Sequence, residues 1–389
     1  MKIVSVVAGP PNFVKLAPVA RALAARDVEH CVIHTGRHDA VAPPGFFDEL
    51  AMLPPQANLE VGSGPHGVQT GLIMQRLEPV LAELRPDTVL VYGDVNATVA
   101  AALVAAKLGI GVGHVEAGLR SADWMMPEEI NRAVTDRVAN LLFAPSRDAV
   151  ANLQNEGVAP DRIQFVGNVM IDTLCRTLPR AQELDPAGRR GLAPGGYAVV
   201  TLRRPGNVDD PTTLRELVAT LADLARTIPV VFPIHPWTRP RVEELGSATG
   251  EGLLLSEPIG YVEMLGLVAS AALVVTDSGG LQEETTYLGV PCLTVRPNTE
   301  RPVTCVHGTN RLVPATRNTI LAAARRALSR RALARPILER WDGHAAERIV
   351  EVLCDGAAFP TDASPFPSRA PAEPARRRGG AIPQPVLGD

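Results

Sequence analysis

Residues 88–118 read TVLVYGDVNATVAAALVAAKLGIGVGHVEAG and contain one complete strand–helix–strand pattern. Two short apolar segments, Thr88–Val91 and Gly111–Val115, flank the alanine-rich segment Ala97–Lys107, whose apolar residues recur at helical spacing. The strand segments are apolar throughout rather than at alternate positions, which is typical of parallel strands covered by helices on both faces. The stretch therefore predicts one βαβ unit of a parallel α/β sheet.

The same alternation extends along the chain in both directions. In the first half, further strands are predicted at Ile3–Val7, Leu141–Ala144 and Ile163–Val166, and further helices at Lys15–Ala25, Val68–Leu84 and Glu128–Asn140. In the second half, the predicted strands are Tyr197–Leu202, Val230–Ile234, Leu253–Leu255, Leu273–Thr276 and Cys292–Val295. Two successive arrays of this kind predict an α/β protein with two Rossmann-like, doubly wound domains that face each other across a cleft.

Composition indicates where these domains end. The segment Thr177–Gly196 is rich in Arg, Pro and Gly, so we place the domains at residues 1–176 and 177–356. Residues 357–389 are rich in Pro, Ala, Ser and Arg and include the run Arg376–Arg378. Such a segment buries too little apolar surface to offset the entropy of ordering, which predicts a disordered tail. An arm that binds an acidic partner is the functional alternative.

The overall composition argues against several classes of protein. In this chain of 389 residues, 38 Lys and Arg stand against 42 Asp and Glu, so the charge favours neither nucleic acid nor an anionic membrane as a partner. The most apolar later stretch, Leu265–Val275, is too short to span a bilayer. The five cysteines are scattered, without the two-residue spacing of a zinc or redox site. We therefore expect free thiols, a cytoplasmic location and no metal.

Carboxylates follow two predicted strands and begin one predicted helix of the first half. Asp94 and Glu116 come at strand ends, where ligands bind in open α/β sheets, and Glu128 lies at the start of a helix. The helix dipole alone would account for Glu128 and Glu129 but not for the two strand-end carboxylates. Three carboxylates in one cleft would raise one another's pKa values, which suits proton transfer.

The second half offers a candidate phosphate-binding turn. The string TDSGG, residues 276–280, joins a predicted strand to a predicted helix, and a glycine-rich helix start can bind a diphosphate through its backbone N–H groups. Glu283 or Glu284, one turn further on, could accept hydrogen bonds from ribose hydroxyls. His235 is either a ligand residue or a strand-end histidine with a structural partner, and a plain turn remains the alternative for the glycines.

Six strings resemble, in order and spacing, the non-hydrolysing UDP-N-acetylglucosamine 2-epimerases: GDVNAT (93–98), HVEAGLRS (114–121), MPEEINR (126–132), FVGNVMIDTL (165–174), TDSGGLQEE (276–284) and NTERP (298–302). The resemblance runs from Met1 to about Leu353. It implies a GT-B-type fold, a homodimer, a nucleotide-sugar substrate, and chemistry without a metal or nicotinamide cofactor. It also implies loss of the C2 proton of the sugar with departure of UDP from C1, through a 2-acetamidoglucal, followed by re-addition with the proton on the other face.

The resemblance also assigns residues to roles. The acid–base carboxylates would be Asp94, Glu116 and Glu128. The residues that hold UDP and the sugar would be Lys15, Arg132, His235, Ser278, Gly279, Gly280, Glu284 and Arg301.

Three positions depart from the family pattern. Pro10 replaces the arginine of a Gly-x-Arg-Pro string, Arg37 replaces the glutamine of Thr-Gly-Gln-His, and Arg203 replaces the histidine of Thr-Leu-His-Arg-Pro. A guanidinium stays protonated at working pH, so Arg203 cannot shuttle a proton, but it can steady a departing β-phosphate. We count Arg203 among the catalytic candidates in that role.

The residues leave alternative functions open beside the epimerase. A glycosyltransferase that passes the sugar to an acceptor is the main alternative, because the three changes would suit a different handling of the leaving group. A nucleotide-sugar hydrolase needs only water in the cleft. A non-catalytic nucleotide-sugar sensor ranks last.

Overall fold

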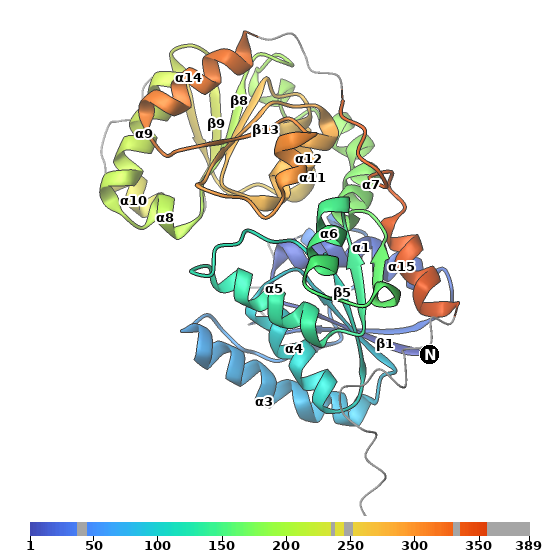
Figure 1. The fold of residues 1–389 in the computed structure, drawn as a ribbon. Coiled ribbons are helices and arrows are strands. Elements are labelled where there is room, and N and C mark those ends of the chain that lie inside the picture. The colour runs from blue at the N-terminus through green and yellow to red at the C-terminus, as the bar shows by residue number, and fades with distance from the viewer. Residues whose placement is uncertain (37–44, 235–237, 245–251, 330–334, 356–389) are drawn as a thin grey trace, which may run out of the picture.

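The computed structural model describes residues 1–36, 45–234, 238–244, 252–329 and 335–355. The predictions for Arg37, His235 and the tail 357–389 therefore lie outside the described residues. Two α/β halves face each other, with the second half above the first in Figure 1. The predicted α/β class with two Rossmann-like, GT-B-type halves is confirmed.

The first half is built on a parallel sheet of seven strands in the order β3-β2-β1-β4-β5-β6-β7. The strands are β1 (Lys2–Val7), β2 (Glu29–His34), β3 (Ala57–Asn58), β4 (Thr88–Tyr92), β5 (Gly111–Val115), β6 (Leu141–Ala144) and β7 (Ile163–Phe165). The helices are α1 (Pro10–Ala24), α2 (Phe46–Glu49), α3 (His66–Leu84), α4 (Asn96–Lys107), α5 (Pro127–Val138), α6 (Arg147–Asn155) and α7 (Val169–Leu184).

The second half repeats this plan with six parallel strands in the order β10-β9-β8-β11-β12-β13. The strands are β8 (Ala198–Thr201), β9 (Val230–Pro233), β10 (Leu253–Ser256), β11 (Leu273–Thr276), β12 (Cys292–Val295) and β13 (Asn310–Val313). The helices are α8 (Pro205–Val208), α9 (Pro211–Ala225), α10 (Arg239–Glu244), α11 (Tyr261–Ala269), α12 (Gly279–Leu288), α13 (Pro302–Val306), α14 (Arg317–Leu328) and α15 (Ala345–Cys354).

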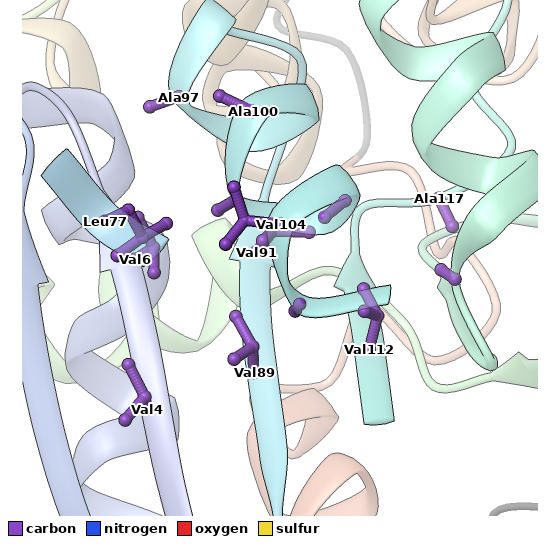
Figure 2. Close-up of a cluster of buried hydrophobic side chains, with 14 of the residues drawn as sticks. Val4, Val6, Leu77, Val89, Val91, Ala97, Ala100, Val104, Val112 and Ala117 are labelled. Carbon is purple, nitrogen blue, oxygen red and sulfur yellow. The ribbon is translucent and has the colours of Figure 1, made fainter. Parts of the chain in front are cut away.

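The central strands are apolar throughout because both faces of the first sheet are covered. Val4 and Val6 of β1 pack with Leu77 of α3 and Val104 of α4 on one face, as Figure 2 shows. The alternate residue Ile3 belongs to the core on the opposite face. Every predicted strand is present, whereas β2, β3 and β13 were not predicted, because their short or polar-rich segments lack a continuous apolar run.

The last described helix, α15, packs against the first half although it follows the second half in sequence (Figure 1). Its residues Ile349 and Leu353 join the core that contains Phe13 of α1. The Asp172 carboxylate of α7 accepts hydrogen bonds from the backbone of Ala345 and of the next residue, at 3.1 and 2.7 Å, and so fixes the start of α15. The predicted boundary after residue 176 falls inside α7 and stays a prediction.

Helix α5 is inverted relative to the usual amphipathic helix, which buries its apolar stripe. Ile130 and Val134 are exposed, whereas Glu129, Arg132 and Asp136 are buried. The helix therefore turns its charged face toward the loops at the ends of β4 and β5.

Candidate active site

The predicted site residues lie in loops at the carboxyl ends of strands in both halves. Asp94 follows β4, Glu116 directly follows β5, and Glu128 lies in the first turn of α5. Strands β4 and β5 are parallel neighbours, so they bring the first two carboxylates to the same edge of the sheet. In the second half, Arg203 follows β8 and Ser278 follows β11, the strand that pairs with β8.

Glu116 joins the two halves. Its carboxylate contacts Lys15 Nζ of α1 and accepts a hydrogen bond from Arg301 Nη2 of the second half at 2.6 Å. The side chain is buried, and its backbone adopts the left-handed conformation with φ of 75°. Burial by itself raises the pKa of Glu116, but Lys15 and Arg301 outweigh burial and leave that pKa below its ordinary value. The expectation that the carboxylates raise one another's pKa is therefore wrong for Glu116, because cations surround it.

Gly93 makes room for this contact. A Cβ at position 93 would lie 2.7 Å from Lys15 Nζ and 3.1 Å from Glu116 Oε2, and the residue has a φ of +66°. Glycine adopts this left-handed backbone without strain, and any other residue here would displace the Lys15 ammonium from its contact with Glu116.

Asp94 is paired with a second cation. Its carboxylate contacts Arg132 Nη2, and the other terminal nitrogen of Arg132 contacts Glu129. Glu129 also accepts hydrogen bonds from the backbone of Ser121 and of Ala122, each at 2.9 Å, so it orders the loop before α5. Arg132 on the buried face of α5 thus forms ion pairs with both Glu129 of the same helix and Asp94 after β4.

Behind these carboxylates lies a support that sequence reasoning missed. His114 Nε2 lies 2.8 Å from the carbonyl oxygen of Gly93, and His114 Nδ1 lies 2.6 Å from Asp136 Oδ1. Asp136 also accepts from the Gly118 backbone at 3.0 Å and pairs with Arg120 at 2.7 Å. Since Asp136 lies one helical turn beyond Arg132, its spacing on the charged face of α5 was the available signal.

Asp277 orders the turn that carries Arg203. Its Oδ2 atom accepts hydrogen bonds from the backbone N–H of Arg203 and of Arg204, each at 2.9 Å, and from Asn207 Nδ2 at 3.0 Å. The Arg203 side chain is exposed beside this turn. Asp277 was quoted within the glycine string but not selected as a functional residue.

The glycine turn lies directly against Arg301. Ser278 precedes α12, and a Cβ at Gly279 would lie only 2.5 Å from Arg301 Nη1. Arg301 in turn contacts Glu116, Glu283 at 2.8 Å, and Glu300. The predicted phosphate-binding turn and the first-half carboxylate are thus linked by one guanidinium.

The neighbouring residues Glu283 and Glu284 point to different partners. Glu283 pairs with Arg301, whereas Glu284 accepts a hydrogen bond from the Tyr261 hydroxyl at 2.9 Å. Burial is the largest cause that raises the pKa of each carboxyl to about 7. The two neighbouring carboxyls therefore share a raised pKa but have different partners.

Glu128 stands apart from these pairs. It is half-buried and lies near Arg204 of the second half. Burial and Arg296 lower the pKa of Arg204, and Glu128 opposes that shift only in part. The structure thus brings Lys15, Glu116 and Arg301 into direct contact, and Asp94 and Arg132 into a second pair. The catalytic and binding roles of all these residues stay predictions.

The described part of the chain has neither a candidate metal cluster nor a candidate membrane span. No three His, Cys, Asp or Glu side chains there are grouped so that they could hold a metal ion. No described helix is long and apolar enough to cross a membrane.

Comparison with known proteins identifies the family. The model of the family UDP-N-acetylglucosamine 2-epimerase matches residues 21–354. A UDP-N-acetylglucosamine 2-epimerase of Methanocaldococcus jannaschii is 38% identical over 375 residues, which cover 92% of this chain and 100% of the relative. A UDP-2,3-diacetamido-2,3-dideoxy-D-glucuronate 2-epimerase of Pseudomonas aeruginosa is 39% identical over 360 residues, which cover 91% of this chain and 99% of the relative.

A solved structure agrees with these relatives. The M. jannaschii UDP-GlcNAc 2-epimerase, in complex with UDP-GlcNAc and UDP, superposes with a TM-score of 0.83 and 38% identity over 91% of this chain and 100% of its own. Family, fold and sequence therefore agree along most of the chain. The chain belongs to the UDP-N-acetylglucosamine 2-epimerase family, whose members are isomerases.

Proposed function

We propose that this protein is a UDP-N-acetylglucosamine 2-epimerase that works by elimination and re-addition of UDP. The observation that carries the proposal is the contact of Glu116, from the first half, with Arg301, which lies against the glycine turn of the second half. A sugar bound beside this pair would have the Glu116 carboxylate within reach and the diphosphate-binding groups of the glycine turn next to it. The M. jannaschii relative was solved with UDP-GlcNAc and UDP, which supports this class of substrate.

The diphosphate binds at the start of α12. The backbone N–H groups of Gly279 and Gly280 lack helical partners at this end and carry partial positive charge, whereas the N–H of Ser278 donates to Thr276 Oγ1 at 2.9 Å. Arg301 adds a full positive charge beside Gly279. These groups stabilise the negative charge that develops on the β-phosphate as the C1–O bond breaks.

The carboxylates exchange the C2 proton. In the elimination step a carboxylate takes the proton from C2, the C–H electron pair forms the C1–C2 double bond, and UDP leaves with the C1–O pair. In the return step the double bond takes a proton at C2 from the opposite face while a UDP oxygen attacks C1. Inversion needs two proton-transfer groups on opposite faces of the ring, and Asp94, Glu116 and Glu128 are the candidates.

The pairing of Glu116 with two cations fits a substrate-dependent activation. Its low pKa keeps Glu116 ionised, so it can accept a proton, but its pairing with Lys15 and Arg301 makes it a weak base. A bound diphosphate competes for these two cations. When Lys15 and Arg301 pair with the phosphate instead of with Glu116, the basicity of Glu116 rises while the sugar is in place.

Arg203 takes the role of an electrostatic partner of the leaving group in this proposal. The turn that carries it is fixed through its backbone N–H, so its side chain is not needed for the fold of the turn. A permanent positive charge next to Arg204 suits the β-phosphate and excludes proton shuttling by this residue.

Incubation with UDP-N-acetylglucosamine in deuterated water tests the function. We expect deuterium at C2 and formation of the C2 epimer. A parallel incubation with UDP-2,3-diacetamido-2,3-dideoxy-D-glucuronate separates the substrates for which the two relatives are named. Release of free sugar, or transfer to an added acceptor, without exchange at C2 of either substrate would contradict the proposal and favour a hydrolase or a glycosyltransferase.

We also propose that the protein is a homodimer that uses the outer face of α5. Trp124 and Met125 before this helix are 65% and 90% exposed, and Ile130 and Val134 one turn apart on it are exposed too. Large apolar side chains gathered at one place indicate a surface that a partner covers. Light scattering on Ile130→Glu should give a monomer where the wild type gives a dimer; a monomeric wild type would contradict the proposal.

The cytoplasm is the compartment that we propose. The five cysteines are all unpaired, as expected where thiols are kept reduced. Cell fractionation with an antibody to the protein tests this location, and recovery outside the cytoplasmic fraction would contradict it.

A further inference from the structure

Tyr261, in the second half, makes hydrogen bonds both to the first half and to a carboxylate of the proposed nucleotide site. Its backbone N–H donates a hydrogen bond to Glu49 Oε2 of the first half at 2.8 Å, and its hydroxyl donates to Glu284 Oε1 at 2.9 Å. Tyr261 is the first residue of α11, and Glu284 lies one turn into α12 beyond the glycine turn. One residue thus contacts both the opposite half and a carboxylate that the proposed function places at the nucleotide.

Glu49, which accepts this hydrogen bond, is held in place by the packing of its own helix. It ends α2, whose Phe47 packs edge-on against Phe13 of α1 with ring centroids 5.1 Å apart. The Glu49 carboxylate faces the start of α11, where a negative charge is favourable to the helix dipole. Gly260 permits this approach, because a Cβ there would lie 2.2 Å from Glu49 Oε1.

The hydroxyl of Tyr261 acts on the charge of Glu284. Burial of Glu284 and the nearby Glu283 on the same helix raise the pKa of Glu284, and the hydrogen bond from Tyr261 lowers it, with a net value of about 7. Cys175 of α7 lies near the Tyr261 hydroxyl and completes the titratable groups around it. A carboxylate must be ionised to accept hydrogen bonds from two ribose hydroxyls with full strength.

We propose that Tyr261 is a positioning residue of the nucleotide site, which keeps Glu284 ionised and oriented toward the nucleoside, and that Glu49 holds Tyr261 in place from the opposite half. The inference rests on the proposed function, because it assigns Glu284 to the nucleotide. It extends that function by making affinity for the nucleotide depend on a contact between the halves. It also predicts that nucleotide affinity rises with pH as Glu284 ionises.

Calorimetric titration of the full chain with UDP, from about pH 6 to about pH 8.5, tests the inference through the ionisation of Glu284. Loss of the hydroxyl in Tyr261→Phe removes a hydrogen bond to a charged group, which we expect to move the midpoint of the affinity curve upward by about one pH unit or more. At pH 7 the affinity should fall about fivefold, because the ionised fraction of Glu284 falls from about one half to about one tenth. The affinities should converge near the upper end of the range. Unchanged midpoints would overturn the inference.

Two variants serve as controls. Tyr287→Phe removes a hydroxyl on α12 that contacts Cys175 Sγ at 2.8 Å and no nucleotide-site carboxylate, so its affinity curve should match the wild type. Glu284→Gln should flatten the curve over the same range; a slope equal to the wild-type slope would show that another group titrates, and would overturn the inference.

Glu49→Ala tests the anchor separately. It leaves the Tyr261 hydroxyl in place but removes the carboxylate that fixes the start of α11, so UDP affinity should fall by about twofold to fivefold at every pH with the midpoint unchanged. Wild-type affinity in this variant would overturn the part assigned to Glu49. Absence of UDP binding by the wild-type protein at every pH would instead overturn the proposed function.

Discussion

Glu116→Gln isolates the proton-transfer role of the carboxylate that joins the two halves. The substitution keeps the size of the side chain and an oxygen that can accept from Arg301 Nη2, which lies 2.6 Å from Glu116 Oε1 in the structure. It removes the negative charge and the basic lone pair. A positioned acid–base group contributes about 10²–10⁴-fold. We therefore expect the rate of C2 deuterium exchange to fall at least about 100-fold, which is about 2.7 kcal/mol in the activation barrier.

The same change alters stability and nucleotide binding in different directions. Loss of one partner from a buried ion pair costs up to about 3–5 kcal/mol, so thermal unfolding should occur at a lower temperature. UDP affinity should be kept or increased, because Lys15 and Arg301 lose the carboxylate that competes with the diphosphate. UDP affinity thus reports whether the variant is folded while exchange is being measured.

A matched control uses the same guanidinium. Glu283 also pairs with Arg301, but burial raises its pKa, whereas the pKa of Glu116 is lowered, so near neutral pH Glu283→Gln changes the charge of the cluster less than Glu116→Gln does. This variant should keep exchange within about tenfold of the wild type. The proton-transfer role of Glu116 is refuted if folded, UDP-binding Glu116→Gln keeps its C2 exchange rate within about tenfold of the wild type. It is also refuted if both variants lose exchange to the same degree.

Two further predictions concern Arg203 and Glu284. Arg203→His should preserve or raise the rate of C2 exchange, because the turn is held through its backbone; a clear fall in that rate would show that Arg203 serves other chemistry. Burial raises the pKa of Glu284 from 4.5 to about 7, so between these pH values the folded state holds a proton that the unfolded state has released. The stabilisation from this proton is full below about pH 4.5 and is lost as the pH rises through about 7. The melting temperature of Glu284→Gln minus that of the wild type should therefore increase from about pH 4.5 to about pH 7. A constant difference in melting temperature would contradict the raised pKa of Glu284.

The strands could be predicted because their residues carry the signal locally. Continuous apolar runs such as Thr88–Val91 report burial on both faces, and all ten predicted strands are found. The strands β2 and β13 were not predicted because they include polar side chains whose partners lie next to them only in the folded protein. His30 Nε2 of β2 lies 2.8 Å from Ser5 Oγ, and Asn310 Nδ2 of β13 donates to Gln282 Oε1 at 3.0 Å. Such partners are distant in sequence, so no local pattern reveals them.

The candidate site could be located from sequence but its electrostatics could not. Asp94 and Glu116 follow strands, and the rule that ligands bind beyond strand ends selects both. The direction of the Glu116 pKa shift depends on Arg301, 185 residues away in the chain, and on Lys15, 101 residues away. Asp277 was missed for the same reason, since its hydrogen bonds join segments that only the fold brings together. Asp136 makes such bonds too, and its helical spacing from Arg132 was the one local signal for it.

The charges around Arg301 join the two halves and bear on the proposed proton transfer. Glu116, Glu283 and Glu300 surround this guanidinium, and Lys15 and Arg296 supply two further cations to the same cluster. These opposite charges pair across the halves through Glu116 and Arg301. In the proposed reaction, a diphosphate at the start of α12 adds negative charge beside Arg301, and Glu283, whose pKa burial raises, is the group that can take up a proton in response. The cluster can therefore accept the phosphate charge while Glu116, freed from its cations, becomes the stronger base.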